Sequence, residues 1–161
     1  MNTRNNPPTT RPQKVPKSVG NVGKRLKVRN ILGNTYAVDG DAVCRKYANF
    51  SDGAHHLWAR FVPFQEFWIE KRKGAAGRFL AAHEWFEYLL MEMLGWKYQK
   101  AHNAACALEL DLRKAWAAGQ VTWQSLTPIW RRHIAHHFRS GSERVLTMWA
   151  TELARSMCRY H

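Results

Sequence analysis

From residue 75 onward, the apolar residues of this chain recur at helical spacing, in segments that glycines separate. In the first segment Phe79, Phe86 and Leu90 fall on one face of a helix, and Gly95 follows as a stop signal. Gly119 ends the second segment in the same way. Helices with an apolar face must bury that face against another layer of structure. The pattern therefore predicts four helices, over residues 75–94, 98–118, 122–138 and from about 140 onward.

Turns and short strands are indicated before the helices. Asp39-Gly40 and Asp52-Gly53 are turn signals, and residues 65–70 alternate in the manner of a half-buried strand. Residues 56–60 are rich in aromatic side chains, and with residues 65–70 they predict a β-hairpin or two adjacent short strands. We therefore expect an α+β fold, in which a small β-hairpin or sheet packs on a mainly α-helical domain over residues 31–161.

Length and composition narrow the class of protein. The chain has 161 residues, enough for one domain, and 45% of them are hydrophobic, which supports a core and excludes disorder throughout. No run of about 18 apolar residues occurs, so no membrane span is expected, and the first eleven residues lack an apolar signal segment. Cys44, Cys106 and Cys158 are far apart, which disfavours a disulfide scaffold or zinc ribbon and favours a reducing compartment.

The positive charge is concentrated near the N-terminus. Residues 1–30 hold eight Lys or Arg and no acidic residue, so of the net charge of +13 only +5 remains on the other 131 residues. Four of the six prolines also fall in the first 16 residues. We predict a flexible basic arm over residues 1–30 that binds the phosphates of a nucleic acid, the alternative being a solubilising tail. The residues expected to bind are Arg11, Lys14, Lys17, Lys24, Arg25, Lys27 and Arg29.

The segment His83-Glu84-Trp85-Phe86-Glu87 carries the strongest chemical signal, an HExxE sequence within a predicted helix. His83 and Glu87 are four residues apart, so their side chains leave one helical face and can bind one metal ion. Glu84 lies beside that face, where a general base can take a proton from a metal-bound water, as in HExxH. The next helix carries His102 and Glu109 on one face, and a short connection between antiparallel helices would bring His102 near His83.

Two histidines and one carboxylate are a sufficient ligand set for catalytic zinc, with the fourth position open for water. The sequence does not distinguish Glu87 from Glu109 as the third ligand. A structural interpretation stands beside this one. HExxE is a weaker motif than HExxH because pairs of glutamates occur on many solvated helices, and His102 beside an alanine fits a packed histidine.

The motifs around this segment have a definite order. Asp39-Gly40-Asp41 precedes Val62-Pro63-Phe64-Gln65-Glu66-Phe67-Trp68-Ile69, and the HExxE core is followed by Gly95-Trp96-Lys97-Tyr98-Gln99-Lys100-Ala101-His102 and Glu109. In order and spacing, the stretch from Val38 to about Arg113 resembles an uncharacterised family of small proteins found in phages, prophages and some bacteria. The family pattern has an acidic-Gly turn, an extended segment that resembles Ile-Pro-x-x-Glu-x-Trp-Ile and a His-Glu-x-x-Glu helix. It continues with Gly-x-x-Tyr-x-x-Ala-His and a later glutamate.

The resemblance implies a zincin-like arrangement, in which a strand lies beside a metal-binding active-site helix. It implies a zinc-dependent, peptidase-like hydrolase with a peptide or protein substrate, in the cytoplasm of a bacterial host or associated with a virion. In zincins with a distal glutamate ligand, the helix supplies two histidines. Here the helix supplies His83 and Glu87 and the downstream residue is His102, so the two ligand types have in effect changed places.

His55-His56 indicates a different chemistry. A small residue followed by His-His is a signature of His-Me finger nucleases, in which a strand histidine acts as general base beside a metal ion and a following helix. The basic composition suits a nucleic-acid substrate, but no downstream His-Asn-His arrangement is evident. Two other interpretations stay open, in which His56 is an accessory ligand near His83 or an edge-strand histidine with no task.

A histidine-rich segment near the C-terminus is the last candidate. His133 and His137 are four residues apart, but no acidic or third ligand is near them in sequence, so we interpret the segment as a basic helix face. Three functions therefore remain. They are a zinc-dependent hydrolase, a nucleic-acid-binding or virion-associated structural protein that acts through its basic arm, and a His-Me finger nuclease that uses His56.

Overall fold

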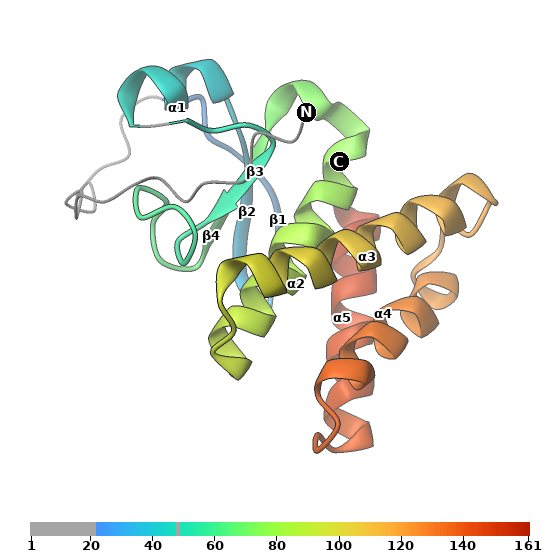
Figure 1. Cartoon of the computed structure of the whole chain (residues 1–161). Helices are drawn as coiled ribbons and strands as arrows, with labels where there is room; N and C mark the ends of the chain where they lie inside the picture. The colour runs from blue at the N-terminus through green and yellow to red at the C-terminus, as the bar shows by residue number, and fades with distance from the viewer. Residues whose placement is uncertain (1–21, 48) are drawn as a thin grey trace.

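The computed structural model describes residues 22–47 and 49–161. In chain order they form β1 (Arg25–Asn30), β2 (Gly33–Val38), α1 (Gly40–Lys46), β3 (Gly53–His55), β4 (Glu66–Glu70), a 3₁₀ segment (Lys71–Ala76), α2 (Gly77–Leu94), α3 (Tyr98–Ala117), α4 (Trp123–His137) and α5 (Glu143–Arg159). In Figure 1 the sheet and α1 lie on one side of the molecule and α3, α4 and α5 on the other. Between them is α2, which contacts both groups. The α+β class expected from the sequence is confirmed.

The four described strands form one sheet in the order β1-β2-β4-β3, in which the central pair, β2 with β4, is parallel. A parallel pair needs a crossover connection, and residues 39–65 supply it with α1 and β3. Asp39 caps α1 by accepting a hydrogen bond from the backbone N–H of Ala42 (3.0 Å). β3 then runs antiparallel to β4, so His55 pairs with Phe67 at the edge of the sheet.

Of the two short strands predicted, the second, at residues 65–70, is confirmed as β4. The first, at residues 56–60, is misplaced. Residues 53–55 pair with β4, whereas the backbone N–H groups of Trp58 and Ala59 both donate to the carbonyl of His55 and close a turn. The aromatic residues of 56–60 serve packing instead of strand pairing. Trp58, for example, stacks on Tyr98 with 3.6 Å between the ring centroids.

The prediction that the flexible arm extends to residue 30 is wrong for residues 25–30, which the structure describes. Residues 25–30 form β1, which pairs antiparallel with β2, and Val28 is buried in the main core. Val22 is buried as well. Basic side chains alternating with apolar ones are what an exposed edge strand carries, so the charge that predicted an arm belongs here to a strand. Arg11, Lys14 and Lys17 lie outside the described residues.

The helices end close to the predicted positions. Gly95 has a φ of 65°, a left-handed conformation that suits glycine, and it closes α2. Thr122 caps α4, and Ser142 caps α5 by accepting a hydrogen bond from the N–H of Val145. The last helix, expected from about residue 140, therefore begins at Glu143. No helix in the described part of the chain has the length and apolar character needed to cross a membrane.

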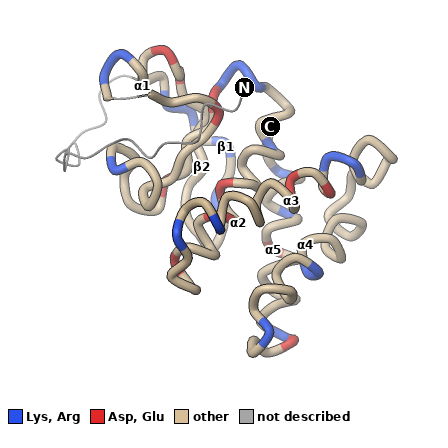
Figure 2. The backbone as a smooth tube through the Cα atoms, viewed as in Figure 1, with Lys and Arg blue, Asp and Glu red and all other residues tan. Residues whose placement is uncertain are grey.

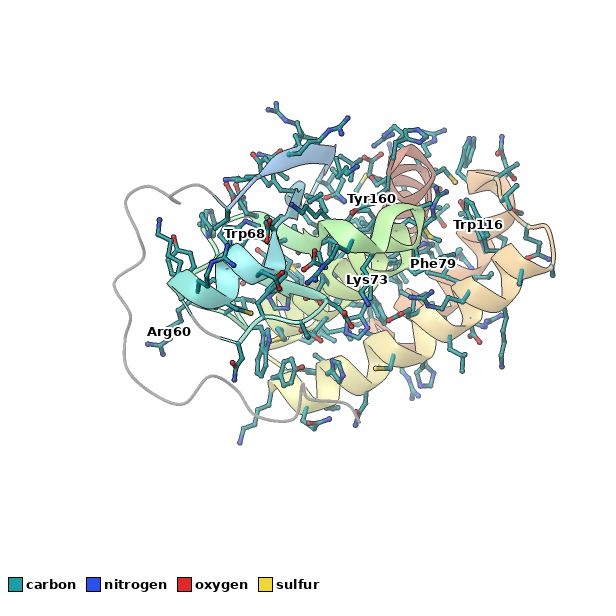
Figure 3. The ribbon with its side chains drawn as sticks, turned by 90° about the horizontal axis from the view of Figure 1, so that it is seen from above. Arg60, Trp68, Lys73, Phe79, Trp116 and Tyr160 are labelled. Atoms are coloured by element: carbon teal, nitrogen blue, oxygen red, sulfur yellow. The ribbon has the colours of Figure 1, made fainter. Side chains whose placement is uncertain are left out.

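Most residues of α2 are buried, on every side of the helix. On the helical side, Phe79 packs edge-on against Trp116 of α3, with 5.8 Å between the ring centroids (Figure 3). On the sheet side, Nε1 of Trp85 donates a hydrogen bond to Oγ1 of Thr35 on β2 (2.9 Å), and both side chains are buried. A helix enclosed in this way also buries its polar residues, including those of the HExxE segment.

Candidate metal centre

Three polar residues of α2 are buried close together. His83, Glu84 and Glu87 expose only 1%, 2% and 1% of their surfaces. Burying a charged or polar group costs free energy unless the group is paired or binds a metal. The HExxE segment is therefore not part of a solvated helix face, which was the structural interpretation of its glutamates.

The donor atoms of His83, Glu87 and His102 form a tight triangle. Nε2 of His83 lies 3.1 Å from Oε2 of Glu87 and 3.1 Å from Nδ1 of His102, and the last two atoms are 2.9 Å apart. With bonds of about 2.0–2.1 Å, two ligands of a tetrahedral zinc ion are about 3.3 Å apart. The triangle is therefore close to one face of a zinc tetrahedron, and small side-chain shifts would fit it to the ion.

The connection between α2 and α3 brings His102 to this position. The two helices pack against each other, and His102 lies in the second turn of α3. Its ring stacks on that of Tyr98, one turn earlier, with 5.2 Å between centroids, and the Tyr98 hydroxyl lies 3.3 Å from Nδ1. The expected proximity of His83 and His102 is confirmed.

Glu109 contacts His83 on the other side of the imidazole ring. Its Oε2 lies 2.9 Å from Nδ1 of His83, whereas Nε2 faces Glu87 and His102. Arg113 forms an ion pair of 2.9 Å with Glu109. Burial would raise the pKa of Glu109, but the hydrogen bond from His83 and the charge of Arg113 hold it below its usual value. Glu109 is therefore placed to orient His83, and Glu87 to share an ion with it.

Electrostatics favour a charged carboxylate at Glu87 and a protonated imidazole at His83 when no metal is bound. Burial alone would raise the pKa of Glu87, but hydrogen bonds from three histidines, His102, His55 and His83, hold it well below its usual value. Burial alone would lower the pKa of His83, but hydrogen bonds with Cys106 and two glutamates raise it well above its usual value. A divalent cation would take the place of protons in this cluster, since metal ligands must be deprotonated.

His55, at the end of β3, also reaches the cluster. Its Nε2 lies 2.9 Å from Oε1 of Glu87, and the side chain is fully buried. The ring of His56 lies instead 5.0 Å from that of Phe64 and 5.3 Å from that of Tyr88. The sequence indicates His56 as an accessory ligand, whereas the structure gives the contact to its neighbour, because His55 ends β3 and His56 begins the turn that follows.

Glu84 and Cys106 complete the set of potential donors. Glu84 forms a buried group with His55 and Glu87, in which potential ligand atoms lie within 4.8 Å of one another. Cys106 forms a second group with His83 and His102, within the same 4.8 Å limit. Its Sγ is 3.5 Å from Nε2 of His102, the ring nitrogen that the triangle does not use. Cys106 is not among the site residues predicted from the sequence, although it lies one helical turn after His102.

A pocket of about 310 Å³ opens beside the triangle. It is lined by Asp52, Leu80, His83, His102, Cys106, Glu109, Leu110 and Arg113. Glu84, the predicted base, is not among these residues. Its carboxylate lies against Gly53 of β3, where an added Cβ would come within 2.9 Å of Oε1. The pocket therefore gives access to the two histidines of the triangle, but not to Glu84.

The basic residues predicted to bind nucleic acid are partly engaged with the domain. Lys24 pairs with Glu66, and Lys27 donates a hydrogen bond to the backbone carbonyl of His161. Arg25 and Arg29 are exposed on β1. Figure 2 shows Lys and Arg on several other elements as well.

The histidines of α4 are held by contacts of their own. Nε2 of His133 lies 2.7 Å from Oδ2 of Asp111, which also accepts a hydrogen bond from Arg132 (3.0 Å). The ring of His137 packs edge-on against that of Trp96, with 4.9 Å between centroids. These contacts agree with a basic helix face.

Comparison of the chain with protein-family models, with curated proteins and with solved structures finds no match. The chemistry of the cluster is therefore inferred from its own geometry. Imidazole, carboxylate and thiol groups from β3, α2 and α3 meet in one place beside a pocket, and the described residues could hold a metal ion there.

Proposed function

We propose that the protein is a zinc-dependent hydrolase in which His83, Glu87 and His102 bind the ion. The observation that carries the proposal is the triangle of their donor atoms, with sides of 2.9–3.1 Å, beside an open pocket. Catalytic zinc has three protein ligands and a water in the fourth position, whereas structural zinc has four protein ligands. The pocket is where that water and a substrate would have access.

The residues around the triangle support this chemistry. A zinc ion would lower the pKa of its bound water to about 7 and polarise a carbonyl group of the substrate. Glu109 orients His83 through Nδ1, and Arg113 balances the charge of Glu109. Because Glu84 lies against β3 and outside the pocket, the acidified water would lose its proton to solvent through the pocket, and not to the predicted base.

The substrate class that we propose is a peptide or protein, as the resemblance implies. The pocket is at the small end of ligand sites, which run from about 300 to 1,000 Å³. It would hold one amide group or one side chain of a larger substrate. The contact of β3 with α2 provides the strand beside the metal-binding helix that a zincin-like site needs.

Metal content is the first test. The purified full-length protein is expected to bind at least one zinc ion per chain, and a His83→Ala, His102→Ala double variant to lose it. His133→Ala is the matched control, because His133 pairs with Asp111 outside the cluster. Full retention of zinc by the double variant would rule out this site. Cleavage of fluorogenic peptides by the zinc-loaded protein, abolished by a chelator, would establish hydrolysis; absence of cleavage would leave a metal-binding protein.

A second candidate is a metal-dependent nuclease of the His-Me finger type. The observation in its favour is that β3, β4 and α2 form a strand-strand-helix unit, with His55-His56 at the end of the first strand and the HExxE segment on the helix. His56 would be the general base. Metal-dependent nicking of plasmid DNA that disappears in His56→Ala would support this function, and nicking that survives the substitution would contradict it.

Nucleic acid is also a proposed binding partner through the basic N-terminal residues. The supporting observation is the charge of residues 1–30, eight Lys or Arg with no acidic residue. Deletion of residues 1–21 preserves β1 and tests the proposal. Binding to DNA or RNA that falls steeply with salt, and that the deletion removes, would support it; absent or salt-insensitive binding would contradict it.

A further inference from the structure

The carboxylate of Glu87 faces two different groups of ligands. Its Oε2 lies 2.9 Å from His102 and 3.1 Å from His83, whereas its Oε1 lies 2.9 Å from Nε2 of His55. All four side chains are buried. A carboxylate that presents one oxygen to each of two ligand groups has the geometry of a bridge between two metal ions.

The second group has a full set of donors. His55, Glu84 and Glu87 are all buried, and their potential ligand atoms lie within 4.8 Å of one another. Two carboxylates on adjacent turns of a buried helix repel each other, and a cation between them removes that cost. One imidazole and two carboxylates suit zinc, manganese or ferrous iron.

The backbone of β3 is shaped to fit Glu84. A Cβ at Gly53 would lie 2.9 Å from Oε1 and 3.0 Å from Cγ of Glu84, so only a glycine lets the strand approach this closely. The same three-residue strand carries His55. The close approach therefore places the imidazole of one element beside the carboxylates of another.

We propose that the cluster binds two divalent metal ions, with Glu87 as the bridging ligand. His83 and His102 hold the first ion, and His55 and Glu84 hold the second. The second ion depends on the zinc site of the proposed function for the shared carboxylate. Two ions in such a centre act together on the attacking and leaving oxygens of one substrate.

Metal stoichiometry tests the second ion. The metal-free full-length chain is dialysed to equilibrium against buffered Zn²⁺ and, separately, Mn²⁺, and bound metal is counted. We expect two ions per chain in the wild type, one in His55→Ala and one in Glu84→Gln. His56→Ala is the matched control and should keep two. Circular dichroism establishes that each variant is folded, and only folded variants are compared.

The outcomes separate the two proposals. One ion in the wild type that His55→Ala retains would overturn the second ion and leave the first site intact. One ion that both His55→Ala and His83→Ala lose would mean a single shared site, which also overturns the proposal. No bound metal in the wild type would overturn both ions. A spectroscopic readout needs no variant: electron paramagnetic resonance of the Mn²⁺-loaded wild type should show spin coupling, and uncoupled ions would contradict a Glu87 bridge.

Discussion

Oε2 of Glu109 lies 2.9 Å from Nδ1 of His83, on the side of the ring away from Glu87 and His102. In a metal-bound state this contact would assign the ring proton of His83 to Nδ1, which donates to the carboxylate, and Nε2 would be the nitrogen that binds the cation. The proposed ligand is thus oriented before a metal binds.

Removing Glu109 should therefore weaken metal binding without removing a ligand. We expect Glu109→Ala to lower zinc affinity by about 10–100-fold, the usual effect of losing such a partner. Competition with a chromogenic chelator measures the affinity. Asp111→Ala is a control on the same helix, since Asp111 pairs with His133 outside the cluster. Equal affinities of the Glu109 variant and the wild type would argue against an orienting role.

The glycine on β3 offers a test of the fit to Glu84. Gly53→Ala introduces a methyl group 2.9 Å from Oε1 of Glu84, closer than carbon and oxygen tolerate, so the strand or the carboxylate must move. We expect a loss of about 1–3 kcal/mol in the free energy of unfolding, the typical cost of overpacking. Chemical denaturation measures it. In a zinc titration of this variant, binding of the second ion should be weakened more than binding of the first. A variant that binds both ions as the wild type does would contradict the close fit of Gly53 to Glu84.

The hydrogen bond between Trp85 and Thr35 joins α2 to the sheet. Thr35→Val keeps the shape of the side chain but leaves the buried indole N–H without its acceptor (2.9 Å in the native protein). An unpaired buried donor costs about 1–3 kcal/mol, and urea denaturation should show a loss of that size. Thr35→Ser restores the hydroxyl and should recover most of it. A Val variant as stable as the wild type would show that the bond contributes little.

Stability should depend on pH through Asp39. Its hydrogen bond from Lys71, followed by the one from the backbone of Ala42, lowers the pKa of Asp39 from 3.8 to about 2. A carboxyl group with a lowered folded-state pKa stabilises the protein above its unfolded pKa and loses that effect as pH falls through the folded value. Asp39→Asn keeps a cap but removes the titration. Lowering the pH from 5 to 2 should therefore reduce the melting temperature of the wild type more than that of Asp39→Asn. Parallel plots of melting temperature against pH for the two proteins would contradict this.

The sequence predicts those parts of the site that follow from helical period alone. His83 and Glu87 share a face because they are one turn apart, and Gly95 ends the helix so that α3 returns alongside it. These two facts were enough to place His102 beside His83. Contacts within one helix, or between two helices joined by a short turn, depend on local geometry, and local geometry can be predicted from a sequence pattern.

The contributions of the sheet are less visible in the sequence. α2 is buried on all sides, so its apolar pattern does not reveal which face meets the strands, and the position of Glu84 against β3 depends on tertiary packing. β3 has only three residues, too few for an alternating pattern to show that His55 faces inward. The basic residues of β1 led to the prediction of a flexible arm, whereas the burial of Val28 holds this segment in the sheet.

The tight connection after α2 has a consequence for how related chains can be found. Residues 95–97 separate the two helices that supply the triangle. An extra residue taken up at the start of α3 would turn His102 by about 100° and move it by about 1.5 Å along the axis. An insertion between the two helices would therefore break the contacts of His102 with His83 and Glu87. The spacing of 15 residues between Glu87 and His102 is therefore a criterion for recognising distant relatives of this protein. It would apply even where little else of the sequence is similar.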